Sequence, residues 1–189
     1  ERFIHQLTYR YTNYIVSSSE MFTRIGLETF GLPEQQFLPI GMPRNDIFFL
    51  ETECVMRNIR KKYNITDGKK IALYAPTYRD SDQTYAEDIL KNAESITHTL
   101  QEKFSGEWIL LFRRHYFADS LKCTFGNIPD VIDVSNHEDM QELLCAADVL
   151  ITDYSSVIWD YGLTKRPCFL YVPDLLEYTN EERSFYLPI

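Results

Sequence analysis

The chain has 189 residues, of which 44% are hydrophobic and 25% are charged, with 7 glycines and 8 prolines. This is the composition of a folded globular protein, and it excludes a disordered or fibrous chain. The formal net charge of −9 disfavours a protein that coats nucleic acid or an anionic membrane, because both attract basic surfaces. Since the first residue is Glu1 rather than Met, we expect a piece of a longer protein.

The cysteines and histidines give no indication of a metal site. The four cysteines are widely spaced, without the Cys-x-x-Cys spacing of a zinc site, so we predict reduced thiols, no metal and no cofactor. They are Cys54, Cys123, Cys145 and Cys168. His5, His98 and His137 have no partner that the sequence reveals. No apolar run approaches the roughly 20 residues that cross a bilayer.

Short apolar segments alternate with segments of helical period, which is typical of βαβ units around a parallel sheet. Strands are predicted at residues 14–17, 37–40, 71–74, 108–112, 131–134, 149–152 and 168–171. Helices are predicted at about 19–30, 47–63, 84–104 and 156–164, and a short helix with Ser135 and Glu138 as its capping box should end before Asp148. Several strands are apolar on consecutive residues, so both sheet faces should be covered. The predicted fold class is α/β, a Rossmann-like doubly wound parallel sheet.

A domain boundary is predicted at residues 41–46, where a strand gives way to a turn and then a helix. Residues 1–46 would be the closing elements of a preceding domain with its linker. Residues 47–189 would form a doubly wound domain of ordinary size.

The segment after the strand at 149–152 is the first candidate site, because ligands of open α/β sheets bind beyond the carboxyl ends of the strands. Ser155 and Ser156 follow Asp153 and open a helix, so their N–H groups and hydroxyls would suit a phosphate. The alternative is a plain serine cap. Neither a glycine-rich dinucleotide motif nor a P-loop motif is present.

A basic cluster follows the strand at 108–112. Arg113, Arg114 and His115 offer bidentate donors and a titratable imidazole, which suit a diphosphate or a departing phosphate. An ordinary basic surface cluster is the alternative.

Two further segments carry polar residues at predicted strand ends or turns. Thr77 and Arg79 follow Pro76, which stops the strand at 71–74, and a turn of incidental polarity is the alternative. Asn45 and Asp46 lie in the predicted boundary, where helix capping is the stronger local interpretation and a role facing a cleft is secondary.

Together these segments resemble the CDP-glycerol glycerophosphotransferase family, the teichoic-acid primases and polymerases of bacterial cell-wall synthesis and their capsule-polymer relatives. The resemblance covers nearly the whole chain. The matching segments are 16–20, 41–46, 74–80, 113–115, 147–156, 160–161, 165–167, 171–174, 177–178 and 183–186. The chain departs from the family pattern at Tyr116, where proline is usual, and at Ser184, where glycine is usual.

The resemblance implies a GT-B fold of two Rossmann-like domains that face a cleft. Residues 47–189 would be the C-terminal domain that binds CDP-glycerol, without its final elements, and residues 1–46 the end of the N-terminal domain. The implied reaction is attack of an acceptor hydroxyl on the β-phosphorus of CDP-glycerol, which releases CMP. The general base would belong to the N-terminal domain, so this piece alone should bind CDP or CMP weakly and catalyse nothing.

The resemblance also implies roles for the candidate residues. Ser155 and Ser156 would hold the diphosphate, and the catalytic His115 with Arg113 would neutralise charge on the departing CMP phosphate. The remaining implied substrate-binding residues are Thr77, Arg79 and Asp153 at the same site, and Asn45 and Asp46 on the hinge side.

The implied partners are the CDP-alcohol donor and a polymer or lipid-linked acceptor, without nucleic acid. The implied location is the bacterial cytoplasm, peripheral to the inner face of the membrane through segments absent here. Two alternatives for the reaction stay open: a transferase of the same family that uses CDP-ribitol, and a GT-B enzyme that uses a UDP-sugar. A non-catalytic α/β binding module is a third.

Overall fold

The computed structural model describes residues 11–50, 52–77, 83–114, 128–172 and 175. The chain divides into two compact units after Leu50. The first unit contains β1 (Ile15–Val16), α2 (Glu20–Phe30), η1 (Glu34–Gln36), β2 (Phe37–Leu38), η2 (Pro43–Asn45) and α3 (Ile47–Leu50). The assignment of residues 1–46 to a preceding domain stays a prediction.

The first unit is built around one pair of parallel strands. β1 pairs with β2 in the register Ile15 to Phe37, as the sequence predicts strands at both places. The Ser19 hydroxyl caps α2 by accepting a hydrogen bond from the backbone N–H of Phe22 at 3.1 Å. The helix ends at Gly31, whose φ of 67° is a conformation that glycine adopts without strain.

The second unit is a parallel five-stranded sheet with the strand order β5-β4-β3-β6-β7. Its elements are α4 (Thr52–Lys62), β3 (Lys70–Ala75), α5 (Gln83–Lys103), β4 (Trp108–Phe112), β5 (Val131–Asp133), α6 (Met140–Ala146), β6 (Val149–Thr152), α7 (Val157–Gly162) and β7 (Cys168–Leu170). The chain enters at the central β3, moves outward through β4 and β5, and returns to the other side of β3 for β6 and β7. This order confirms the predicted Rossmann-like sheet, and the reversal between β3 and β6 is its topological switch point.

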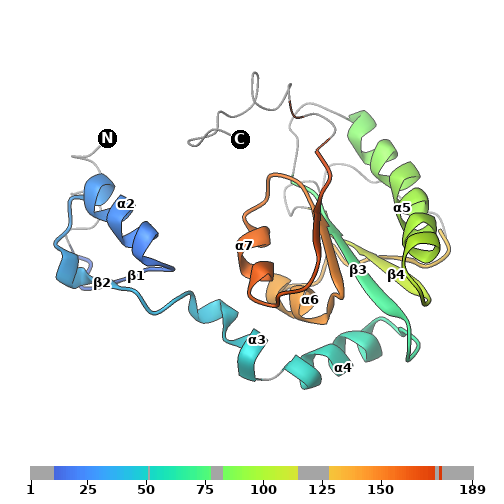
Figure 1. The fold of residues 1–189 in the computed structure, drawn as a ribbon, viewed down its shortest axis with the longest axis horizontal. Coiled ribbons are helices and arrows are strands. Elements are labelled where there is room, and N and C mark those ends of the chain that lie inside the picture. Colours follow the sequence, from blue (N-terminus) through green and yellow to red (C-terminus); the bar gives the residue numbers. More distant parts are fainter. Residues whose placement is uncertain (1–10, 51, 78–82, 115–127, 173–174, 176–189) are drawn as a thin grey trace. The chain divides into compact units, whose positions relative to one another are not determined.

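Helices cover both faces of this sheet (Figure 1). On one face α5 packs against a core that includes Tyr74, Leu110, Phe112 and Ile151. The alternate strand residues, such as Leu73 and Leu111, are also fully buried, and α6 with α4 packed against it covers that second face. Burial on both faces explains why these strands are apolar on consecutive residues.

The predicted cap of α6 is wrong. The helix starts at Met140, and its cap is Asp139, whose Oδ1 accepts a hydrogen bond from the backbone N–H of Gln141 at 2.8 Å. Ser135 instead donates its hydroxyl proton to the Asp133 carboxylate. Two other helices differ in extent: the predicted helix at 47–63 contains α3 and α4, and the one at 156–164 is the six-residue α7.

Two classes of feature are not found among the described residues. No helix there combines the length and hydrophobicity that a membrane span requires. Likewise, the described part of the chain holds no group of three or more histidine, cysteine and acidic side chains with the geometry of a metal site.

Candidate functional site

Polar side chains connect β3 and β6 at the topological switch point. Beyond the last backbone pair, Ala75 with Thr152, the Thr152 hydroxyl donates to the carbonyl oxygen of Ala75 at 2.7 Å. Pro76 follows the end of β3. The Thr77 N–H then binds the Asp153 carboxylate, at 2.9 Å from Oδ1 and 3.1 Å from Oδ2, and the Thr77 hydroxyl donates to Oδ1 at 2.6 Å.

The structure thus brings together two residues that the sequence predicts as separate site candidates. Thr77 and Asp153 are 76 positions apart in the chain, and Asp153 is only 5% exposed. The crevice beyond the strands at a switch point is the usual ligand position in such sheets, so this contact marks the floor of the candidate site.

The two serines after β6 differ in their relation to the cap of α7, and only Ser155 makes a capping-type contact, which is long. Ser156 occupies the cap position of α7, but it has helical dihedral angles, it is exposed, and its side chain makes no capping hydrogen bond. The half-buried Ser155 accepts a long hydrogen bond of 3.4 Å from the backbone N–H of Val157. Both serines lie at the same sheet edge as Asp153, and their contact with a phosphate stays a prediction.

Arg113 leaves β4 at this edge, where its backbone N–H donates to the carbonyl of Tyr74 at 2.9 Å. Its Nη1 atom is buried and has no hydrogen-bond partner among the described residues. Burial lowers the pKa of the guanidinium, while the nearby Asp139 and Tyr63 act to raise it. A partly desolvated cation with an unused donor is suited to an anionic ligand.

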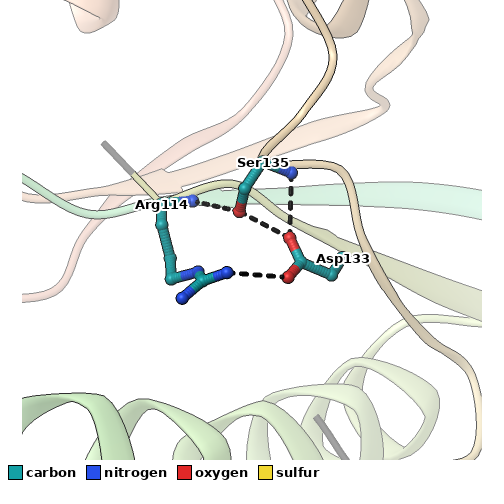
Figure 2. Close-up of polar contacts among 3 residues, drawn as sticks. All are labelled: Arg114, Asp133 and Ser135. Carbon is teal, nitrogen blue, oxygen red and sulfur yellow. Dashed lines mark hydrogen bonds and ion pairs between the residues drawn. The ribbon is translucent and has the colours of Figure 1, made fainter. Parts of the chain in front are cut away.

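Arg114 has a different environment, which Figure 2 shows. Its Nη2 atom lies 3.3 Å from Oδ2 of Asp133, the last residue of β5, and its backbone N–H donates to the Ser135 hydroxyl at 2.9 Å. The Ser135 N–H and hydroxyl both donate to Oδ1 of Asp133, at 2.8 and 2.5 Å. This group fixes the end of β4 to the end of β5, so the predicted basic cluster is divided between two environments.

The remaining candidates lie elsewhere. Asn45 and Asp46 belong to the first unit, where Asn45 is buried and the carbonyl of the exposed Asp46 accepts hydrogen bonds from the backbone N–H groups of Phe49 and Leu50 in α3. The predicted catalytic His115 and the predicted Arg79 lie outside the described residues.

Sequence reasoning missed the environment of His137, which it treated as lacking a partner. The residue is 4% exposed; its Nδ1 lies 3.0 Å from both Lys62 Nζ and Tyr63 Oη, and its Nε2 lies 2.8 Å from a carboxylate oxygen of Glu142. Burial raises the pKa of Tyr63, and the charge of Arg113 opposes that change. Two of these partners are more than 70 residues away in sequence, so no local pattern indicated the cluster.

Comparison with known proteins identifies the family. The model of the family described as CDP-Glycerol:Poly(glycerophosphate) glycerophosphotransferase matches residues 3–189. The chain belongs to this family. The resemblance stated from the sequence is therefore confirmed.

Relatives within the glycerophosphotransferase family include both glycerol and ribitol enzymes. A teichoic acid poly(glycerol phosphate) polymerase of Staphylococcus epidermidis is 34% identical over 93% of this chain and 24% of its own length. A teichoic acid ribitol-phosphate polymerase of Staphylococcus aureus is 32% identical over 98% of this chain and 36% of its own. The chain thus spans well under half of these relatives.

The fold is also that of a solved family member. The wall teichoic acid polymerase TagF, a GT-B-like protein, superimposes with a TM-score of 0.78 at 32% identity, over 98% of this chain and 45% of TagF. A variant of TagF has also been solved after a soak with CDPG. These matches confirm the predicted fold class.

Proposed function

We propose that this chain supplies the donor site of a transferase that moves glycerol phosphate from CDP-glycerol to a hydroxyl acceptor in teichoic-acid or capsule polymer synthesis. The observation that carries the proposal is the polar contact at the switch point, where Asp153 after β6 binds Thr77 after β3. In this step the acceptor oxygen bonds to the β-phosphorus of the donor. The bond from that phosphorus to the bridging oxygen breaks, and CMP leaves.

Charge complementarity supports this assignment. The donor diphosphate is anionic, and at the same sheet edge Arg113 has a buried donor without a partner among the described residues. The hydroxyls of Ser155 and Ser156 add neutral donors next to β6. In this proposal His115 stabilises the charge on the departing CMP phosphate, and Arg79 borders the site.

The other parts of the whole protein's activity are proposed on the resemblance alone. Residues 47–189 act as the donor-binding domain of a GT-B enzyme, whose second domain supplies the general base. Asn45 and Asp46 lie on the hinge side of its cleft. The acceptor is a polymer or lipid-linked alcohol, and the enzyme works in the bacterial cytoplasm at the inner face of the membrane.

CDP-ribitol is the second candidate donor. The ribitol-phosphate polymerase of Staphylococcus aureus is nearly as similar to this chain as the glycerol enzyme is. The two donors share the CDP group, so the described polar contacts suit both of them.

Release of the nucleotide product by the full-length protein tests the proposal, measured as CMP from a CDP-alcohol and as a uridine nucleotide from a UDP-sugar. CDP-glycerol, CDP-ribitol and a UDP-sugar are each supplied with a lipid-linked glycerol phosphate acceptor. We expect CMP release from CDP-glycerol and a loss of at least about tenfold in turnover for His115→Ala. Turnover of the UDP-sugar alone would contradict the proposal, and turnover of CDP-ribitol alone would select the second candidate.

A further inference from the structure

Two side chains, those of Thr152 at the end of β6 and of Asp153 just after it, continue the pairing with β3 where β3 leaves the sheet. The odd-numbered residues of this segment face β6: the Ile71 carbonyl accepts a hydrogen bond from the backbone N–H of Asp148, and Ala75 and Thr77 follow on the same side. The Thr152 hydroxyl donates a hydrogen bond to the Ala75 carbonyl, and the Asp153 carboxylate accepts one from the N–H of Thr77. The position of Thr77 is therefore set by side chains from the end of β6 and from the residue after it.

The carboxylate of Asp153 is directed to Thr77. Both of its oxygens accept the Thr77 N–H, and Oδ1 also accepts the Thr77 hydroxyl at 2.6 Å. The side chain is buried, and a buried carboxylate requires hydrogen bonds to remain charged. A direct contact with a diphosphate would set two negative groups against each other.

We propose that Asp153 is a positioning residue, which fixes Thr77 at the donor site and does not itself bind the donor. This inference rests on the proposed function, and it reassigns a residue that the sequence predicts as substrate-binding. Asp153 thus acts on the donor through the position of Thr77.

The same geometry limits what Thr77 can do. A threonine hydroxyl has one proton, and that proton is donated to Asp153. Thr77 therefore cannot donate it to a phosphate oxygen while the bond to Asp153 persists. While that bond persists, the Thr77 hydroxyl can contact the ligand only as a hydrogen-bond acceptor, for example from a hydroxyl or amine of the ligand. The phosphate donors then come from other groups of the site.

Binding to variants of the full-length protein tests this role. CDP-glycerol and CMP are titrated by calorimetry into wild type, Asp153→Asn, Thr77→Val, Thr77→Ser and the double variant Asp153→Asn with Thr77→Val. Asparagine places an amide donor against the Thr77 N–H, so we expect Asp153→Asn to weaken both ligands equally, by about five- to tenfold. Thr77→Val should weaken both by about fivefold, and Thr77→Ser should restore most of the affinity because it keeps the hydroxyl.

The double variant distinguishes positioning from direct contact. If Asp153 acts through Thr77, the double variant should bind no more than about twofold worse than Asp153→Asn alone, since both changes break one unit. Thr99→Val on α5, whose exposed hydroxyl donates to the Ser95 carbonyl at 2.7 Å, is the matched control and should bind like wild type. Thermal unfolding of each variant verifies folding, and Thr77→Val tests the proposal if Asp153→Asn does not fold.

Three outcomes would overturn the inference. Unchanged or tighter binding by Asp153→Asn would show that the carboxylate has no positive role. Loss of CDP-glycerol binding with normal CMP binding would show a direct contact with the glycerol group. Additive losses in the double variant would show independent roles. If wild type binds neither ligand, the proposed function itself fails. If wild type binds both ligands and the variants show one of the three patterns above, only the inference about Asp153 fails.

Discussion

The guanidinium of Arg166 donates a hydrogen bond to the carbonyl oxygen of Ala147 at 2.7 Å. The same nitrogen donates to the Cys145 carbonyl at 2.7 Å, and the buried Tyr161 hydroxyl donates to Ala147 at 3.1 Å. These carbonyls lie at the C-terminal end of α6, where helix carbonyls have no partner within the helix. Arg166 and Tyr161 therefore fix the connection from α6 into β6, whose other end carries Asp153.

Replacement of Arg166 should therefore affect stability. Arg166→Gln should lower the free energy of unfolding by about 1.5–3 kcal/mol, because it removes two charged hydrogen bonds to partly buried carbonyls. Tyr161→Phe should cost about 1 kcal/mol, since Arg166 still binds the Ala147 carbonyl. Urea unfolding measures both changes. Arg57→Gln, on the exposed side of α4, is the control, and equal stability of Arg166→Gln and this control would contradict the assignment.

The two arginines after β4 should differ in their effect on donor binding. Arg113→Met should weaken CDP binding by about tenfold or more, because it removes a charged donor that has no described partner. Arg114→Met should have a smaller effect, since the Arg114 guanidinium pairs with Asp133. Calorimetric titration of CDP compares the two variants. The opposite order of affinities would show that Arg114 contacts the donor instead.

The cysteine thiols should react in order of their exposure. Cys54 is exposed and Cys145 is buried, and burial raises the pKa of the Cys145 thiol. Because the thiolate is the reactive form, Cys145 should have less of it than an ordinary thiol at pH 8, and more as the pH rises through the raised pKa. Iodoacetamide labelling followed by peptide mapping should modify Cys54 first and Cys145 only on unfolding. Rapid labelling of Cys145 in the folded protein would contradict this prediction.

The sheet was predictable because burial on both faces leaves a local mark in the sequence. The predicted strands at 71–74, 108–112 and 149–152 agree with β3, β4 and β6 to within one residue at each end, since each is apolar on consecutive residues. The rule that ligands bind after the strands also selected Thr77 and Asp153. The bond between these two residues was not predictable, because it depends on the strand order.

Local patterns failed where another residue binds the group to which the pattern assigns a different role. Ser135 and Glu138 have capping-box spacing, but the Ser135 hydroxyl is bound to Asp133 and Asp139 caps α6 instead. His137 gave no signal because Lys62 and Tyr63 meet it only in the folded chain. A local hydrogen bond two residues away thus decided the first case, and tertiary hydrogen bonds decided the second.

Donor binding by the serines after β6 tests the central proposal most directly. CDP-glycerol is titrated by calorimetry into the full-length wild type, the double variant Ser155→Ala with Ser156→Ala, and Ser95→Ala, an exposed serine on α5, as control. If both hydroxyls bind the diphosphate, the double variant should lose about 1–3 kcal/mol of binding free energy, and the control should match wild type. Equal affinity of the double variant and wild type, or no binding of CDP-glycerol by wild type, would contradict the account.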